Sequence, residues 1–320
     1  MKRSLVLLVV LAVVIGTGVA LWRGSGPLPD PEGCSAELAA QRVDLTTEQG
    51  ENAALIAAIG VSRGLPARAV SIALATAYQE SKIRNLTHGD RDSLGLFQQR
   101  PSQGWGTTAQ VRDPYHAINK FYDALEKIDD YKSMRITEAA QRVQRSAFPE
   151  AYEEHAAGAR ALASALTGWS PRRFSCVADE PDVTPQTLQA SGLTPRAERV
   201  RANLEAAFGP LSLGGFAPGG VTTGHMPGSA HYEGRAVDVF VRPIDEANRR
   251  TGWAMAAYLV AHAERLGIGN VIFDDRIWSS GRSSESGWRP YTPPRTGSTP
   301  AEQAILEHRD HVHVDVVRGD

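Results

Sequence analysis

Residues that could bind a metal ion are concentrated near the C-terminus. From His311 the sequence alternates, so that His311, His313 and Asp315 are separated by valines. In a β-strand this period of two places the imidazoles and the carboxylate on one face and the valines on the other. Zinc binds imidazole and carboxylate groups, and a catalytic zinc site combines three protein ligands with one open position. The alternation therefore predicts a strand over 311–317 with one face suited to a metal site.

A second segment of the same region contains the other candidate ligands. His231 and Asp238 stand in a His-x6-Asp pattern, and Asp238 lies inside the apolar stretch 237–241. A carboxylate there is costly to bury unless it is paired or bound to a metal. We predict that both residues supply ligands to the same metal site as the strand over 311–317. Surface histidines beside a buried, hydrogen-bonded aspartate are the alternative interpretation. His225, a lone histidine in a Gly-rich loop, is more often unremarkable than a ligand.

The His-x6-Asp pattern and the later His-x-Asp-His-x-His segment together resemble the zinc D-alanyl-D-alanine peptidases and their LAS-type murein peptidase relatives. The resemblance covers roughly the last 100 residues. It implies an α+β zinc-peptidase-like domain that cleaves an amide bond in the stem peptide or the cross-link of peptidoglycan. The implied zinc ligands are His231, Asp238 and His313.

The same resemblance implies roles for three further residues. Asp310 is expected to be the general base, and His308 and His311 to support the ligands or the transition state. Zinc lowers the pKa of its bound water toward about 7, and a nearby carboxylate can pass the proton to the leaving amine. One feature departs from the family pattern, because residues 213–220 lack the arginine usually found upstream of the first histidine. The candidate replacements are Arg282 and Arg289.

A glutamate in the N-terminal half lies on an apolar helix face. Residues 66–80 predict a helix, with a proline suited to its first turn. Ala73, Ala77 and Glu80 fall on one face at helical spacing. A carboxyl group among apolar neighbours has a raised pKa, which suits a general acid. A glutamate on the exposed helix surface is the alternative.

The Glu-Ser pair at 80–81, the Gly-Asp-Arg that follows and the Gly-Leu-Phe-Gln block at 95–98 resemble the lysozyme-like superfamily, nearest to goose-type lysozymes and soluble lytic transglycosylases. The resemblance covers about 120 residues and implies cleavage of the MurNAc–GlcNAc bond. It implies Glu80 as the catalytic acid and Asp90 near the attacking water. Arg100 replaces a second acid, which favours transglycosylation slightly over hydrolysis. The implied wall of the sugar cleft includes Gly95, Leu96 and Gln98.

Two domains are expected to position these groups. The 320 residues have an ordinary globular composition, with 42% hydrophobic residues. Residues 49–176 read as a mainly α lysozyme-like domain, 177–195 as a Pro-rich linker and 196–320 as an α+β domain. The net charge of −2 provides no basic surface that would favour nucleic acid.

The N-terminus predicts export from the cytoplasm. Two basic residues precede an uncharged apolar run at 5–22, so 1–25 is a membrane anchor or a signal segment and 26–48 a linker. The length of the run favours an uncleaved single-pass anchor over a cleaved signal of a secreted protein. Outside the cytoplasm, Cys34 and Cys176 are expected to form a disulfide, with two free thiols as the alternative.

The sequence as a whole predicts a bifunctional, zinc-dependent enzyme that remodels peptidoglycan by cutting both glycan strands and peptide amide bonds. The alternative is a non-catalytic peptidoglycan-binding scaffold with one or both sites inactive. The missing upstream arginine and the presence of Arg100 motivate this alternative.

Overall fold

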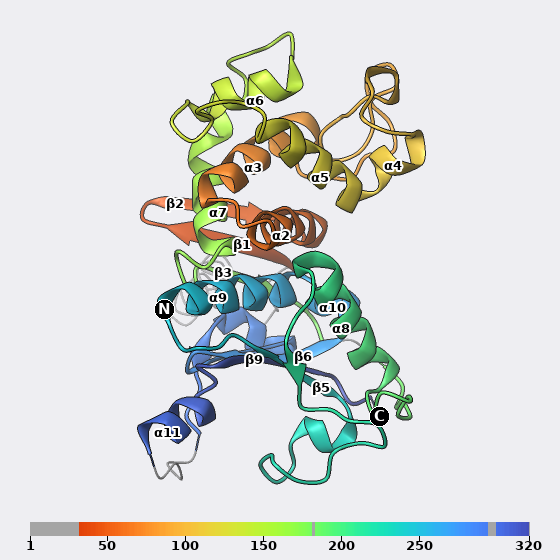
Figure 1. The fold of residues 1–320 in the computed structure, drawn as a ribbon, viewed down its shortest axis with the longest axis vertical. Coiled ribbons are helices and arrows are strands. Elements are labelled where there is room, and N and C mark those ends of the chain that lie inside the picture. Colours follow the sequence, from red (N-terminus) through yellow and green to blue (C-terminus); the bar gives the residue numbers. More distant parts are fainter. Residues whose placement is uncertain (1–31, 181–182, 294–298, 320) are drawn as a thin grey trace, which may run out of the picture.

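The computed structural model describes residues 32–180, 183–293 and 299–319, and it has a helical N-terminal region followed by an α+β C-terminal region (Figure 1). This confirms the predicted order of the two fold types. Within the part of the chain that is described, no helix is both long and apolar enough to cross a membrane. The predicted anchor or signal segment at 1–25 lies outside the described residues.

The N-terminal region combines six α-helices with a small sheet among the described residues. Its strands pair antiparallel in the order β2-β1-β3. The helix α3 lies against α7 and α6, and its middle residues are fully buried. The elements are β1 (Gly33–Leu38), β2 (Gln41–Leu45), α2 (Thr47–Ser62), α3 (Ala67–Ser81), α4 (Thr108–Arg112), α5 (Pro114–Leu125), α6 (Ile136–Gln144), α7 (Ala156–Leu166) and β3 (Phe174–Val177).

A disulfide closes the N-terminal region. Cys34 of β1 and Cys176 of β3 are paired in the sheet register and are joined through their sulfur atoms, as predicted. The bridge spans 142 residues of sequence. Restricting so long a loop in the unfolded chain contributes about 5 kcal/mol in the chain-entropy account of disulfides. A bond of this kind fits a protein located outside the cytoplasm.

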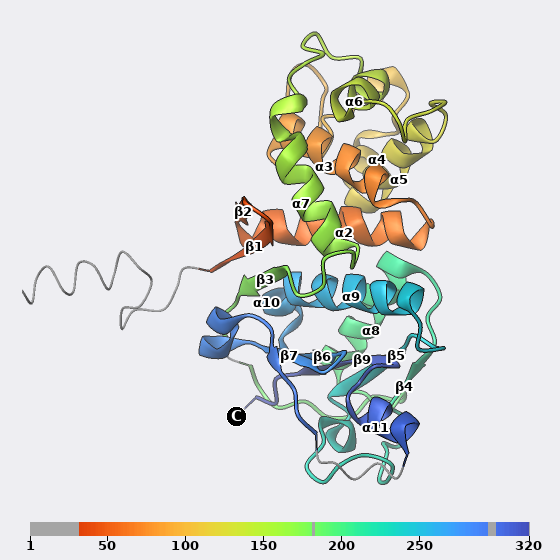
Figure 2. The ribbon, with the colours of Figure 1, turned by 90° about the vertical axis from the view of Figure 1, so that its left-hand side faces the viewer.

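The C-terminal region contains an antiparallel sheet with strand order β4-β5-β9-β6-β7-β8. The helices α8 and α9 contact one face of this sheet and lie on its side nearer the N-terminal region (Figures 1 and 2). The elements are α8 (Pro195–Phe208), β4 (Leu213–Gly214), β5 (Ala236–Phe240), α9 (Glu246–Ala261), α10 (Ala263–Leu266), β6 (Ile268–Phe273), β7 (Arg276–Ser279), β8 (Arg289–Pro290), α11 (Pro300–Leu306) and β9 (His311–Val316).

The two regions pack directly on each other. The helix α2 contacts α9 and α8, and one cluster of buried side chains continues through both regions. The Trp278 indole N–H donates to the Cys176 carbonyl at 3.1 Å, and Arg265 forms an ion pair with Glu51 at 3.1 Å. The predicted linker at 177–195 therefore joins two regions that share a core.

Candidate functional site

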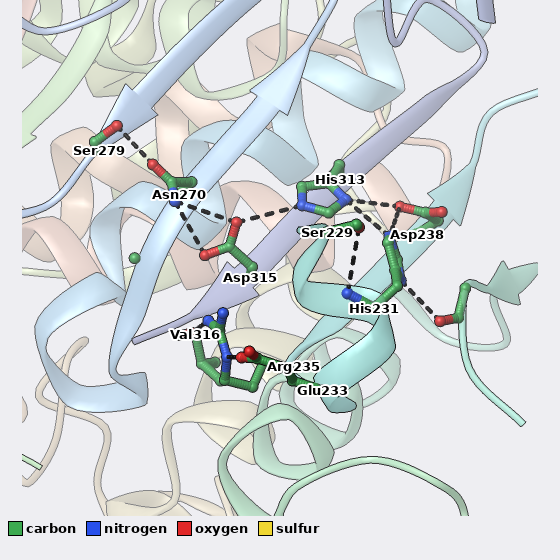
Figure 3. A network of polar contacts seen from close by, with 12 residues as sticks. Ser229, His231, Glu233, Arg235, Asp238, Asn270, Ser279, His313, Asp315 and Val316 are labelled. Atoms are coloured by element: carbon green, nitrogen blue, oxygen red, sulfur yellow. Dashed lines mark hydrogen bonds and ion pairs between the residues drawn. The ribbon is translucent and has the colours of Figure 1, made fainter. Parts of the chain in front are cut away.

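The predicted zinc ligands come together on the face of the sheet that α9 does not cover. The strands β5 and β9 are neighbours, and their register places Asp238 opposite His313. His231 lies in the 3-10 turn Ala230–Glu233 that precedes β5. The side chains of all three residues are buried and point toward one another (Figure 3). Strand pairing thus brings together residues that are far apart in sequence.

The three candidate donor atoms form a compact triangle. His231 Nε2 lies 3.1 Å from His313 Nδ1 and 3.2 Å from Asp238 Oδ1. His313 Nδ1 and Asp238 Oδ1 lie 3.0 Å apart. Donors bound tetrahedrally to one zinc ion at about 2.0–2.1 Å lie about 3.3 Å apart. The residues therefore fit a zinc ion in both donor type and spacing.

Hydrogen bonds to the far side of each imidazole determine which nitrogen faces the triangle. His231 Nδ1 lies 2.7 Å from the Gly215 carbonyl oxygen, which can only accept a hydrogen bond, so Nδ1 carries the proton. Nε2 therefore keeps the lone pair that can bind a metal ion. His313 Nε2 lies 3.3 Å from an Asp315 carboxylate oxygen, so Nδ1 is the nitrogen that faces Asp238 and His231. Asn270 in turn donates to Asp315 at 3.1 Å. Partners of this kind orient the histidines of metal sites and increase their basicity.

Gly215 is required at its position for steric reasons. Its φ is +81°, and a Cβ atom there would lie 2.2 Å from Cε1 of His231. Only glycine can therefore bring its carbonyl against this imidazole.

A second set of polar side chains lies beside the triangle. His311 Nδ1 donates to Asp310 Oδ1 at 2.7 Å, and Arg242 Nε donates to Asp310 Oδ2 at 2.7 Å. The Arg242 guanidinium also lies over the Phe240 ring at 4.1 Å. Both oxygens of Asp310 are thus engaged. The free nitrogen of His311, Nε2, lies 3.8 Å from Asp238 Oδ1 and is directed toward the triangle.

Asp310 and His308 both have lowered pKa values, which leave the first charged and the second uncharged at neutral pH. Burial disfavours the charged form of Asp310, but His311 and Arg242 outweigh it and hold the pKa of the carboxyl below its ordinary value. Burial, together with the neighbouring His313 and His311, lowers the pKa of His308 to about 3. His308 is therefore uncharged at neutral pH, and its Nδ1 donates to the Leu306 carbonyl at 3.1 Å.

The three residues of the triangle line a cavity of about 540 Å³ together with Arg242, His308 and His311. On one side it is bounded by the loop segment 224–230 and on another by the end of α11. Met226 and Ile305 provide exposed apolar side chains at these two edges, each 44% exposed. Arg235 and Arg242 are the arginines among the described lining residues, whereas Arg282 and Arg289, the replacements considered from sequence, are absent from the lining.

The charge state of the metal-free triangle predicts a pH-dependent zinc affinity. Burial opposes the charged form of His313, but hydrogen bonds with Asp238 and Asp315 raise the pKa of this imidazole to about 9. Zinc binds the neutral imidazole, so a proton must leave first. The apparent affinity is expected to rise about tenfold per pH unit from about pH 6.5 toward 9 and then to level off.

Chelator-competition titrations across this pH range measure the effect. An affinity that stays constant between about pH 6.5 and 9 would contradict a protonated His313 in the metal-free protein. The stability of the metal-free protein changes in the opposite direction. The ion pair of His313 with Asp238 contributes fully below the unfolded-state pKa of about 6.5 and is lost as the pH rises through about 9.

In the N-terminal region, Glu80 lies in the last turn of α3 and is half-buried. The Tyr152 hydroxyl donates to Glu80 Oε1 at 2.7 Å. Tyr152 is fully buried, so this hydrogen bond holds the carboxyl group in one orientation. Burial and the nearby Glu80 raise the pKa of Tyr152, which therefore remains a donor at neutral pH.

The predicted cleft wall is attached directly to the end of α3. Ser81 donates to the Leu96 carbonyl at 2.7 Å, which explains the Glu-Ser pair in structural terms. The Gln98 amide donates to the Gly95 carbonyl at 3.2 Å, and Gln144 of α6 donates to the Phe97 carbonyl at 2.8 Å. A cavity of about 680 Å³ is lined by Gln144 and its neighbours at the end of α6, by the segment at the end of α5 and by Trp105 before α4. Glu80 is not in its lining.

The other acidic residues of this region are placed differently. Asp90 lies on an exposed loop, with 94% of its side chain accessible. Arg100, which replaces the expected second acid, forms an ion pair with Asp92 at 2.7 Å. Asp92 also accepts from the Ser102 backbone N–H, and these bonds lower the pKa of its carboxyl group. Arg100 therefore has a structural role, because its side chain is held in the ion pair with Asp92.

Comparison with known families identifies a match in the C-terminal region. Residues 189–303 match the family described as VldE, C-terminal domain. The matched segment includes His231 and Asp238 and ends before β9. It supports a peptidoglycan-related function for the C-terminal region. No curated protein matches the chain.

Two residues at these sites were not indicated by the sequence, and a third, His225, was interpreted there as more often unremarkable than a ligand. Arg242 lies outside the sequence motifs that indicated the site. Tyr152 follows Glu80 by 72 residues, so no helical or strand periodicity connects the two. The His225 ring stacks on His231 with ring centroids 3.9 Å apart, and His225, His231 and Asp238 form a candidate metal-binding group. The only sequence signal for His225 was its position six residues before His231.

Proposed function

We propose that the C-terminal region is a zinc-dependent amide hydrolase acting on the peptide part of peptidoglycan. The observation that carries this proposal is the triangle of His231, Asp238 and His313, which lines one cavity together with His311. His311 is in turn hydrogen-bonded to Asp310. His231, Asp238 and His313 would hold the zinc ion, which when bound would supply an activated water and Lewis-acid polarisation of the substrate carbonyl. The VldE match suggests a peptidoglycan-related function, with which this choice of polymer is consistent.

In this proposal His311 is the group that moves protons. Its Nδ1 proton is held by the ionised Asp310, so Nε2 has the free lone pair and faces the cavity. Nε2 takes a proton from the attacking water and returns it to the leaving amine. Asp310 positions the ring, and Arg242 holds Asp310 in place. This assigns Asp310 an orienting role instead of the general-base role expected from sequence.

We further propose that the N-terminal region cleaves the glycan strand with Glu80 as the acid. The supporting observation is the hydrogen bond from buried Tyr152, which directs one oxygen of Glu80 and leaves the other available. Asp90 is exposed and Arg100 is paired with Asp92, so neither provides a second carboxyl group fixed beside Glu80. This arrangement favours the lytic transglycosylase reaction, in which no water has to be positioned.

Digestion of purified sacculi by the full-length, zinc-loaded protein tests both proposals together. Mass spectrometry is expected to reveal anhydro-muropeptides from the glycan reaction and loss of terminal D-alanine or of cross-links from the amide reaction. The variant Glu80→Gln should retain only the second set of products, and His313→Ala only the first. The His313→Ala protein should also lose its single bound zinc ion.

The double variant serves as the control for the scaffold alternative. If the wild-type protein leaves sacculi as intact as the double variant does, the enzyme proposals are wrong. Binding without cleavage in a sacculus pull-down would then favour a non-catalytic peptidoglycan-binding protein.

A further inference from the structure

The loop between β4 and the 3-10 turn brings an additional imidazole to the metal triangle. Residues 222–228 are exposed except for His225, which is half-buried. The Tyr232 hydroxyl accepts from the His225 backbone N–H at 3.1 Å and donates to the His225 carbonyl. His225 is therefore the residue through which this part of the loop is attached to the site.

The position of the ring places it within reach of the candidate donors. A ligand atom of His225 lies within 4.8 Å of those of His231 and Asp238. Two donors on one zinc ion lie about 3.3 Å apart, so a small rotation of the side chain brings His225 to ligating distance. In the described conformation its ring is inclined by only 18° to that of His231. Two nearly parallel, stacked imidazoles cannot both hold the ion in their ring planes, so the stacked and ligating positions are alternatives.

The loop has the freedom that such an exchange needs. Gly224 and Gly228 flank His225, both have positive φ, and no atom lies within 4 Å of a Cβ built on either. The loop also forms one edge of the 540 Å³ cavity, where Met226 is exposed. Movement of this segment would open the cavity and withdraw the imidazole at the same time.

We propose that His225 is a fourth, exchangeable zinc ligand that closes the metal site until the substrate amide displaces it. The proposal rests on the zinc site of the proposed function. A site with four protein ligands has no open position, as in structural zinc centres, whereas a catalytic centre requires one. His225 thereby makes the site latent, and the loop segment 222–228 acts as the closing element.

X-ray absorption spectroscopy of the zinc-loaded, full-length protein tests the proposal by counting imidazole ligands. The wild-type protein is expected to have three, and His225→Phe and His225→Ala two. Phenylalanine retains a ring that can stack on His231 but offers no nitrogen, so it is the matched control for a purely packing role. Both variants are expected to bind zinc roughly tenfold more weakly in chelator competition.

Two imidazoles in the wild-type protein, with a zinc affinity that His225→Phe leaves unchanged, would overturn the role of His225 and leave the three-ligand site intact. A wild-type protein that binds no zinc at the triangle would overturn both proposals. Matching thermal unfolding of the wild-type protein and His225→Phe, both metal-free, confirms that the comparison reports on ligation.

Discussion

Replacing His311 with alanine is expected to slow amide hydrolysis by about two to four orders of magnitude, the usual contribution of a positioned acid–base group. The residue has its Nδ1 proton bound to Asp310 and its Nε2 directed at the metal triangle. Its removal leaves the three zinc donors in place. Turnover of a purified cross-linked muropeptide should therefore fall while the zinc content remains at one ion per chain.

Chemical rescue separates the two candidate bases. Added imidazole should restore part of the activity of His311→Ala, because a free ring can occupy the vacated space beside Asp310. The same addition should not restore Asp310→Ala, in which the native ring has lost its orienting carboxylate. If His311→Ala retains wild-type activity and Asp310→Ala does not, Asp310 is the base, as expected from the sequence resemblance.

Replacing Glu80 with glutamine is expected to lower the rate of glycan cleavage by about two to four orders of magnitude, because the amide cannot donate a proton to the leaving oxygen. Glutamine has nearly the same volume and can still accept from Tyr152, so the folded structure should be preserved. The release of anhydro-muropeptides measures the effect. Amide products from the other region provide an internal control for folding.

A second variant tests whether orientation of Glu80 matters. Tyr152→Phe removes the 2.7 Å hydrogen bond and leaves the ring packed in the core. The loss of this hydrogen bond should lower glycan cleavage by up to roughly tenfold. Unchanged cleavage in this variant would show that Tyr152 only packs. Cleavage that persists in Glu80→Gln would place the catalytic acid elsewhere in the chain.

The two regions share one buried core, so they are best tested together in the full-length protein. The cluster of buried side chains is shared between α2 and α9, and the Trp278 indole donates to the Cys176 carbonyl across the boundary. Separating the regions would expose apolar surface on both. Point variants of the full-length protein are therefore the appropriate reagents for assigning each activity.

Local sequence periodicity determined much of what was predicted correctly. The alternation after His311 requires a strand with the histidines on one face, because successive side chains point to opposite faces. The valines of that strand are buried as expected. The helical spacing of Ala73, Ala77 and Glu80 likewise follows from the chain itself. The disulfide was predictable because the chain has only two cysteines and its N-terminus predicts export.

The neighbours of each functional group were decided by the tertiary structure alone. Asp238 meets His313 because β5 pairs with β9 in one register, and sequence spacing does not contain that register. Arg242 reaches Asp310, and Tyr152 reaches Glu80, through contacts between elements distant in the chain. Hydrogen bonds with Arg242 and His311 engage both oxygens of Asp310. Stacking of the His225 ring on His231 places His225 beside the triangle of candidate ligands. Sequence determines which groups are available and which face they occupy, whereas their partners depend on long-range packing, which periodicity does not encode.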